Sequence, residues 1–231
     1  MRLVLFVLAV LLGTPAAANE CVILLHGMVR SSASMETMAE AIEEAGFVAA
    51  NIDYPSRDHP IEVLAPIAVE AGLKRCDELG ATGKQHFVTH SLGGILVRKY
   101  LSEKQISNLG RVVMLGPPNQ GSDAVDDLGG VPGFDWINGP AGRQLGKGPE
   151  SVPLQLGAAD FEVGIIAGTR TIDPITSSVL EDPDDGKVSV EDTKLEGMTD
   201  FIIVEHSHAF MMRMKRPIEL TINFLKTGRF E

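Results

Sequence analysis

The sequence predicts an α/β domain with a mostly parallel central sheet and helices on both faces. Short runs rich in Val and Ile alternate along the chain with segments of helical periodicity. The runs are continuously apolar, which is typical of strands that are covered on both faces. They span residues 21–25, 47–52, 86–89, 112–115, 163–167 and 201–204. Strands that alternate with helices favour right-handed parallel connections.

Helical periodicity fills the intervals between these strands. Between the first two strands, apolar residues recur on one face at Met35, Met38, Ile42 and Ala45, and Ser32 or Ser34 is the expected cap. A second helix is expected around 64–79, and a third over 92–101, directly after the third strand. Pro217 suits the first turn of a final helix with a buried stripe.

The amino terminus has the pattern of a secretory signal peptide. Arg2 precedes an apolar run over 3–12, and Ala16, Ala17 and Ala18 fit a cleavage site, with Asn19 as the mature start. The apolar run is too short to span a membrane, which takes roughly 20 residues. We therefore expect residues 1–18 to be removed and the protein to be exported, to a periplasm or to the medium.

The remaining chain, 19–231, is of a length that suits one domain. The formal net charge of −11 disfavours binding to nucleic acid and to anionic lipid headgroups. No later segment has transmembrane length, so we expect no stable membrane insertion. The sequence does not indicate an oligomeric state.

The two cysteines, Cys21 and Cys76, are a disulfide candidate, because an exported protein enters an oxidising compartment. The alternative is a pair of buried thiols. The choice depends on the separation of the two Cβ atoms, which the sequence leaves open.

Residues 119–160 interrupt the strand–helix pattern with a Gly- and Pro-rich stretch. Long excursions of this kind are usually functional or disordered. The stretch contains Phe134 and Trp136, the single tryptophan of the chain. We expect either a surface excursion with a few buried anchors or a small lid, in which Phe134 and Trp136 line an apolar substrate pocket.

Ser91 is the candidate nucleophile. The segment Thr-His-Ser-Leu-Gly-Gly at 89–94 follows a predicted strand and opens a predicted helix. This is the setting of a nucleophile elbow, in which a sharp turn presents the serine hydroxyl above the sheet. Thr89 departs from the usual G-x-S-x-G pattern, and an ordinary helix cap at Ser91 is the simpler alternative.

The loop after the first strand begins with His26, Gly27 and Met28. It should lie beside the elbow, so that the backbone N–H groups of Met28 and Leu92 converge on one oxygen as an oxyanion hole. We expect His26 to be a structural hydrogen-bonding residue.

A serine nucleophile needs a base, and the base needs an orienting carboxylate. The acid is expected in the acidic segment after the fifth strand, as Asp185, with Asp184 as the alternative. The base is expected after the last strand, as His208, with His206 as the alternative. The order Ser, acid, His is the one that this type of sheet uses.

At these residues the chain resembles bacterial lipases and esterases of the α/β-hydrolase superfamily. The resemblance rests on VILLHGM, NIDYPSR, FVTHSLGGILVRKYL, RVVMLGPPNQGSD, DDGKVSVEDTKLEGM and HSHAFMM. It implies the α/β-hydrolase fold and supports Asp185 and His208, which are separated as the acid and base are in such lipases. It implies no cofactor. Some lipases of this kind hold calcium, but no convincing ligand set stands in this sequence, so no metal is expected.

The resemblance implies hydrolysis of small-molecule or lipid carboxylic esters through an acyl-enzyme. A low aromatic content of 5% favours an esterase over an interfacial lipase. An amidase, a thioesterase or an acyltransferase would use the same triad. The remaining alternative is a non-catalytic binding protein with this fold.

Overall fold

Six parallel strands form the central sheet, in the order β2-β1-β3-β4-β5-β6. The computed structural model describes residues 19–130, 133–172, 174–181 and 183–231. The predicted signal segment 1–18 lies outside the described residues. The strands are β1 (Cys21–Leu25), β2 (Val48–Ile52), β3 (Gln85–His90), β4 (Leu109–Leu115), β5 (Val163–Gly168) and β6 (Asp200–Val204). This confirms the predicted parallel α/β architecture.

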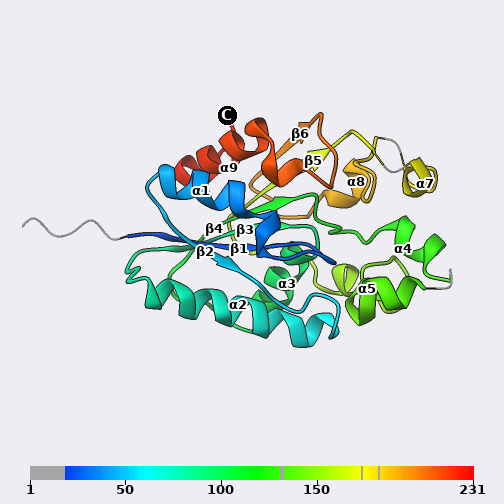
Figure 1. The fold of residues 1–231 in the computed structure, drawn as a ribbon, viewed down its shortest axis with the longest axis horizontal. Helices are drawn as coiled ribbons and strands as arrows, with labels where there is room; N and C mark the ends of the chain where they lie inside the picture. Colours follow the sequence, from blue (N-terminus) through cyan, green and yellow to red (C-terminus); the bar gives the residue numbers. More distant parts are fainter. Residues whose placement is uncertain (1–18, 131–132, 173, 182) are drawn as a thin grey trace, which may run out of the picture.

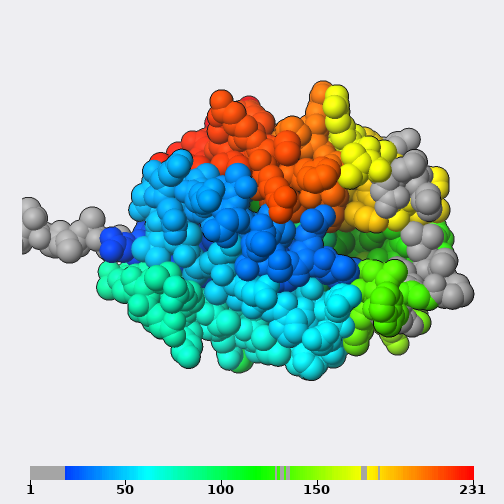
Figure 2. All heavy atoms as spheres, viewed as in Figure 1, coloured from blue at the N-terminus to red at the C-terminus, as the bar shows by residue number. Residues whose placement is uncertain are grey.

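Helices cover both faces of the sheet. Figure 1 shows α1 (Glu36–Glu44) and α9 (Lys215–Thr227) on one face, and α2 (Ile61–Glu78) and α3 (Leu92–Leu101) on the other. In β1, Val22 and Leu24 belong to the core under the first pair of helices, whereas Ile23 and Leu25 belong to the core under the second pair. Because neighbouring side chains of a strand point to opposite faces, both sets must be apolar. In the space-filling view of Figure 2, α1 and α9 lie above α2, which runs along the lower edge.

The first helix begins differently from the prediction. Residues Ser32–Ser34 form a 3₁₀ helix, and α1 starts at Glu36 with Met35 as the residue that precedes it. Neither Ser32 nor Ser34 caps α1. The Ser34 hydroxyl instead donates to the Ser31 carbonyl oxygen at 2.8 Å, which is a local bond that competes with capping.

Helices make up half of the described part of the segment 119–160. It contains α4 (Asp123–Leu128), α5 (Phe134–Arg143) and α6 (Val152–Gln155). Two further short helices, α7 (Pro174–Ser177) and α8 (Val190–Thr193), lie in the connection between β5 and β6, and a second 3₁₀ helix, Met211–Arg213, precedes α9. Figure 1 shows α4, α5, α7 and α8 together beyond the carboxyl ends of the strands. That edge is where parallel α/β sheets usually bind ligands.

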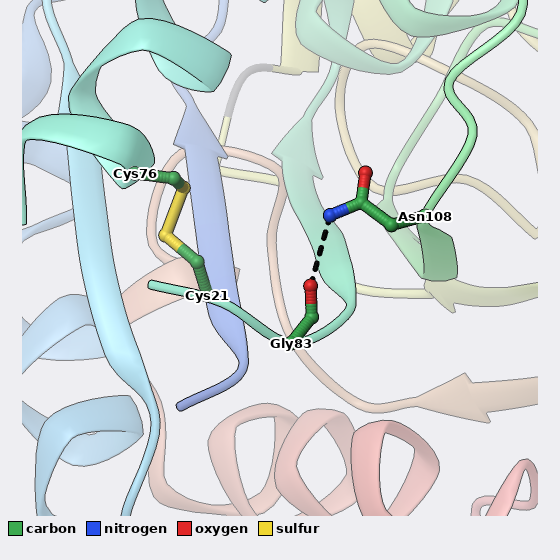
Figure 3. Close-up of a disulfide and its surroundings, with 4 residues drawn as sticks. All are labelled: Cys21, Cys76, Gly83 and Asn108. Atoms are coloured by element: carbon green, nitrogen blue, oxygen red, sulfur yellow. Dashed lines mark hydrogen bonds between the residues drawn. A yellow bond between two sulfur atoms is a disulfide. The ribbon is translucent and has the colours of Figure 1, made fainter. Parts of the chain in front are cut away.

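At the opposite edge, Cys21 and Cys76 form a disulfide with a Cα–Cα distance of 5.9 Å. It joins the first residue of β1 to the end of α2 (Figure 3). Beside it, the side-chain amide of Asn108 donates to the Gly83 carbonyl oxygen at 2.9 Å. The bridge is one of the two outcomes that the sequence left open. Among the described helices, none is long and apolar enough to cross a membrane.

Replacing both cysteines by alanine should lower the free energy of unfolding by about 4 kcal/mol. The bridge closes a loop with a sequence separation of 55, and without it the unfolded chain gains the corresponding entropy. Urea unfolding of wild type, of wild type in reductant and of the double variant measures this loss. The reduced wild type should match the variant, and equal midpoints for oxidised and reduced protein would contradict the expectation.

Candidate active site

Ser91 lies in a strained turn between β3 and α3. Its backbone has φ 52° and ψ −120°, one of two non-glycine residues in the described chain with positive φ. Such a conformation persists when the surroundings enforce it, and it is concentrated at functional sites. The Ser91 N–H donates to the Leu115 carbonyl oxygen at 2.9 Å, and the Gly94 N–H donates to the Ser91 carbonyl oxygen at 3.0 Å. These bonds fix the turn on both sides of the serine.

Small residues after Ser91 make the turn possible. A Cβ on Gly93 would lie 2.6 Å from the Leu25 carbonyl oxygen, and a Cβ on Gly94 would lie 3.2 Å from the Thr89 hydroxyl oxygen. Thr89 therefore fits where the common pattern has glycine, because Gly94 leaves space for its hydroxyl. That hydroxyl donates to the Val113 carbonyl oxygen at 3.3 Å inside the sheet.

Asp185 and His208 form a buried pair. The Asp185 Oδ2 atom accepts a hydrogen bond from His208 Nδ1 at 2.8 Å, and the two residues are 1% and 8% exposed. The other oxygen of Asp185 accepts from the backbone N–H groups of Lys187 and Val188, at 3.0 and 2.9 Å. The His208 N–H also donates to the Asp185 carbonyl oxygen at 2.9 Å. With the proton on Nδ1, the Nε2 lone pair of His208 is left as a base.

Asp184 and His206, the alternatives for the acid and the base, do not take part in the Asp185–His208 pair. The Asp184 carboxylate accepts hydrogen bonds from the Gly186 N–H and the Ser177 hydroxyl, both at 2.6 Å, so it shapes the loop. His206 is held through its backbone, with its N–H bonded to Val204 and its carbonyl oxygen to Arg170. The His206 side chain does not line the cavity that Ser91 and His208 share.

Ser91 and His208 line one cavity of about 460 Å³. No hydrogen bond joins the two side chains in the described structure, and such contacts often tighten only when substrate binds. Half of the lining is apolar, which suits an acyl or alkyl chain. The apolar members are Met28, Val29, Pro118, Ala124, Val125, Ile137, Leu145 and Val188.

Met28 and Leu92, the predicted oxyanion donors, flank Ser91. Met28 lines the cavity, and Leu92 is the first residue of α3. The first N–H groups of a helix have no partner within the helix. The Met28 N–H likewise donates to no acceptor among the described residues. Neither amide thus has an acceptor among the described residues.

His26 holds the loop that carries Met28. Its ring stacks on Tyr54 with centroids 4.1 Å apart, Nδ1 donates to the Gly27 carbonyl oxygen at 2.8 Å, and Nε2 accepts from the Tyr54 N–H at 3.3 Å. Burial lowers the pKa of His26, because desolvation penalises the charged ring. A neutral imidazole satisfies both bonds, which matches the predicted structural role.

The prediction that Trp136 lines the pocket is wrong. Its side chain is 84% exposed and is not among the lining residues, whereas its neighbours Ile137 and Asn138 are. Adjacent residues of a helix point about 100° apart, so one face of α5 meets the cavity and Trp136 turns away. Phe134 begins α5, and its side chain lies outside the described part of the structure.

His90 was not expected to have a role in the site, but the structure brings it to His208. The His90 Nε2–H donates to the His208 carbonyl oxygen at 2.9 Å, and the two rings are 4.6 Å apart. Desolvation lowers the pKa of His90 well below its usual value, and the neighbouring His208 lowers it further. His90 thus stays neutral and holds the loop of His208. The one feature of the sequence that pointed to a role for His90 was its position next to Ser91.

This fold is that of the α/β-hydrolases. No family model matches the chain, and no curated protein matches it in sequence. Among solved structures, it is similar to the mature lipase BlEst2 of Bacillus licheniformis, with 19% identity over 94% of each chain and a TM-score of 0.70.

Two further structures share the architecture. The phospholipase PlaB of Legionella pneumophila is 19% identical over 93% of this chain and 58% of its own, with a TM-score of 0.69. The metagenomic carboxyl esterase MGS0156 is 15% identical over 84% of this chain and 65% of its own, with a TM-score of 0.63.

Gly116 should be essential to the Asp185–His208 pair. A Cβ there would lie 2.9 Å from both Asp185 Oδ2 and His208 Nδ1, and the backbone has φ +55°. Gly116→Ala should lower kcat on a p-nitrophenyl ester by about 100-fold, because it displaces the imidazole. Gly80→Ala is the matched control, with φ +74° and nothing within 4 Å. Equal activity of the two folded variants would count against the role of Gly116.

Proposed function

We propose that this chain is an exported serine hydrolase that cleaves carboxylic esters through an acyl-enzyme. Ser91 is the nucleophile, His208 the base and Asp185 the residue that orients the base. Met28 and Leu92 supply the oxyanion hole. The observation that carries the proposal is the buried Asp185–His208 hydrogen bond of 2.8 Å beside a cavity that Ser91 and His208 share.

The strain at Ser91 supports the nucleophile assignment. A helix cap needs no positive φ, and the Ser91 side chain makes no capping hydrogen bond to α3. The hydroxyl is instead directed by a backbone conformation that L-residues rarely adopt. The positive end of the α3 dipole lies at the same place and favours negative charge on a reacting oxygen.

In the first half-reaction, Ser91 Oγ attacks the ester carbonyl carbon while His208 Nε2 accepts the hydroxyl proton. The carbonyl oxygen becomes an oxyanion that the Met28 and Leu92 N–H groups bind, each donor being worth about 3 kcal/mol in the transition state. The tetrahedral intermediate then expels the alcohol, which takes the proton from His208. Asp185 holds the imidazole in the required tautomer and stabilises its charged form.

In the second half-reaction, His208 deprotonates a water molecule, which attacks the acyl-enzyme. The carboxylic acid leaves and Ser91 recovers its proton. The apolar part of the cavity suits a hydrocarbon acyl or alkyl group. The similar structures are named as a lipase, a phospholipase and a carboxyl esterase, which also favours an ester over an amide as substrate.

Action outside the cytoplasm is part of the proposal. The Cys21–Cys76 bridge supports it, because disulfides form and persist mainly in oxidising compartments. The signal-peptide pattern of residues 1–18 points the same way.

Ser91→Ala should abolish ester hydrolysis, with a loss of about 10⁴-fold or more in kcat, because no other group forms the acyl-enzyme. A chain-length series of p-nitrophenyl esters measures the rate, with the matching amides and thioesters as a parallel panel. Wild type should also be labelled by a fluorophosphonate and the variant should not. Undiminished turnover by a folded Ser91→Ala protein would refute the nucleophile assignment.

Comparing His208→Ala with His206→Ala identifies the base. Replacing His208 removes the group bonded to Asp185, so kcat should fall by about three orders of magnitude or more. Replacing His206, two residues away and half-buried, should leave kcat within a few-fold of wild type. A larger loss from His206→Ala would reverse the assignment.

A further inference from the structure

The Lys and Arg residues that line the cavity beside Ser91 contrast with the acidic character of the protein as a whole. The full chain carries a net charge of −11. The lining of the cavity nevertheless includes Arg30 and Lys187, and none of its described lining residues is Asp or Glu. In an acidic protein, a cationic lining is the pattern that attracts an anionic ligand.

Arg30 is a cation that has no counter-ion in the described part of the chain. It makes no ion pair or hydrogen bond among the described residues, whereas most of the other arginines and lysines near the carboxyl edge are engaged. It follows Met28 and Val29 in the loop after β1, so its backbone is two residues from the predicted oxyanion donor. An unpaired guanidinium at this place can meet a charged part of the substrate while the ester lies at Ser91.

A second cation strengthens the field at Arg30. The Arg30 side chain is exposed at the rim of the cavity, and partial desolvation there lowers the pKa of its guanidinium, which the nearby charge of Arg213 lowers further. Arg213 is held by carbonyl oxygens, with bonds of 3.5 Å to Ser34 and 3.4 Å to Ala33, and by no carboxylate in the described structure. Two guanidiniums that repel each other, and that pair with no carboxylate among the described residues, would both be stabilised by a bound anion.

The carboxylates around this site have other partners or other positions. Asp185 is buried behind His208. Asp53 and Asp58 line a neighbouring polar cavity that Arg30 also borders. Asp53 accepts a hydrogen bond from the Ser32 N–H at 3.0 Å and lies 3.5 Å from His26 Nε2. None of them pairs with Arg30, so the guanidinium remains available to a ligand.

We propose that Arg30 binds an anionic group of the substrate, and that the preferred substrates are esters that carry a phosphate or carboxylate as well as an apolar chain. This rests on the proposed ester hydrolysis and specifies its substrate class. The apolar part of the cavity takes the hydrocarbon, Ser91 the ester carbonyl and Arg30 the anion. Guanidinium is suited to this role, because its fork of donors matches both carboxylate and phosphate oxygens.

Paired substrates of equal length test the proposal and distinguish the two positions of the anion. Mono-p-nitrophenyl glutarate and p-nitrophenyl pentanoate differ by a carboxylate at the end of the acyl chain. Oleoyl glycerol phosphate and mono-oleoyl glycerol differ by a phosphate on the alcohol side, and both are supplied below micelle-forming concentrations. For wild type, kcat/KM should be at least about 10-fold higher for the anionic member of one pair. The pair that shows the preference identifies the source of the anion.

Variants at Arg30 connect the preference to this side chain. In Arg30→Gln, the anionic-to-neutral ratio of kcat/KM should fall to about one, and in Arg30→Glu it should invert. Arg75→Gln removes the same charge from the end of α2 near the disulfide, at the opposite edge of the sheet, and should keep the wild-type ratio. The wild-type preference should also decline between low and high salt, because screening weakens the attraction.

Two results would overturn the proposal: no preference for either anionic substrate in wild type, or a preference that survives in Arg30→Gln. Using the ratio within each variant removes any effect of partial unfolding. Failure of the proposed hydrolysis would look different. In that case wild type would cleave neither the neutral esters nor the anionic ones and would not react with a fluorophosphonate.

Discussion

The buried carboxylate of Asp185 constrains the whole carboxyl edge of the sheet. A charged group with 1% exposure is tolerated only when its oxygens are satisfied, and here two loop amides and one imidazole do so. The amides fix the turn that follows β5, and the imidazole fixes the loop that follows β6. The space around the pair must stay empty, which is why Gly116 at the end of β4 has no side chain. The carboxylate of Asp185 thus shapes the connections that follow β4, β5 and β6.

A second buried charge ties the helix after Ser91 to the loop that carries the acid. Arg98 in α3 is 5% exposed, and burial lowers its pKa to about 10. Its guanidinium donates to the carbonyl oxygens of Pro153 and Gly157 and to both oxygens of Asn119. Asn119 in turn donates to the Thr193 carbonyl oxygen at 2.8 Å, at the end of α8. Carbonyl dipoles solvate this cation in place of water, and they connect α3, α6 and α8.

The sequence predicted the sheet well because its strands are buried on both faces. A continuous apolar run such as 21–25 has few other interpretations, and the helix over 92–101 was found with its observed bounds. The candidate triad was foreseeable from chain order alone, since each residue follows a particular strand. The sequence favoured Asp185 over Asp184 and His208 over His206 without excluding the alternatives, because neighbours in a loop differ only in direction.

The less accurate predictions share a physical cause, which is tertiary packing. The Gly- and Pro-rich stretch over 119–160 suggested an excursion, yet α4, α5 and α6 form there. Trp136 looked like a pocket residue by composition, but its place on α5 turns it to solvent. Periodicity and motif spacing revealed neither the bond of His90 to the His208 backbone nor the place of Arg30 between the cavity at Ser91 and the neighbouring polar cavity.

The disulfide lies at one pole of the molecule, and the candidate active site lies toward the other. The covalent tie joins β1 to α2 at the pole where no candidate chemistry occurs. The opposite pole, with α4, α5, α7 and α8, is assembled from short helices held by hydrogen bonds and side-chain packing. Formation of the bridge would therefore prolong the lifetime of the fold against proteases and heat without a covalent restraint on the short helices at the carboxyl edge.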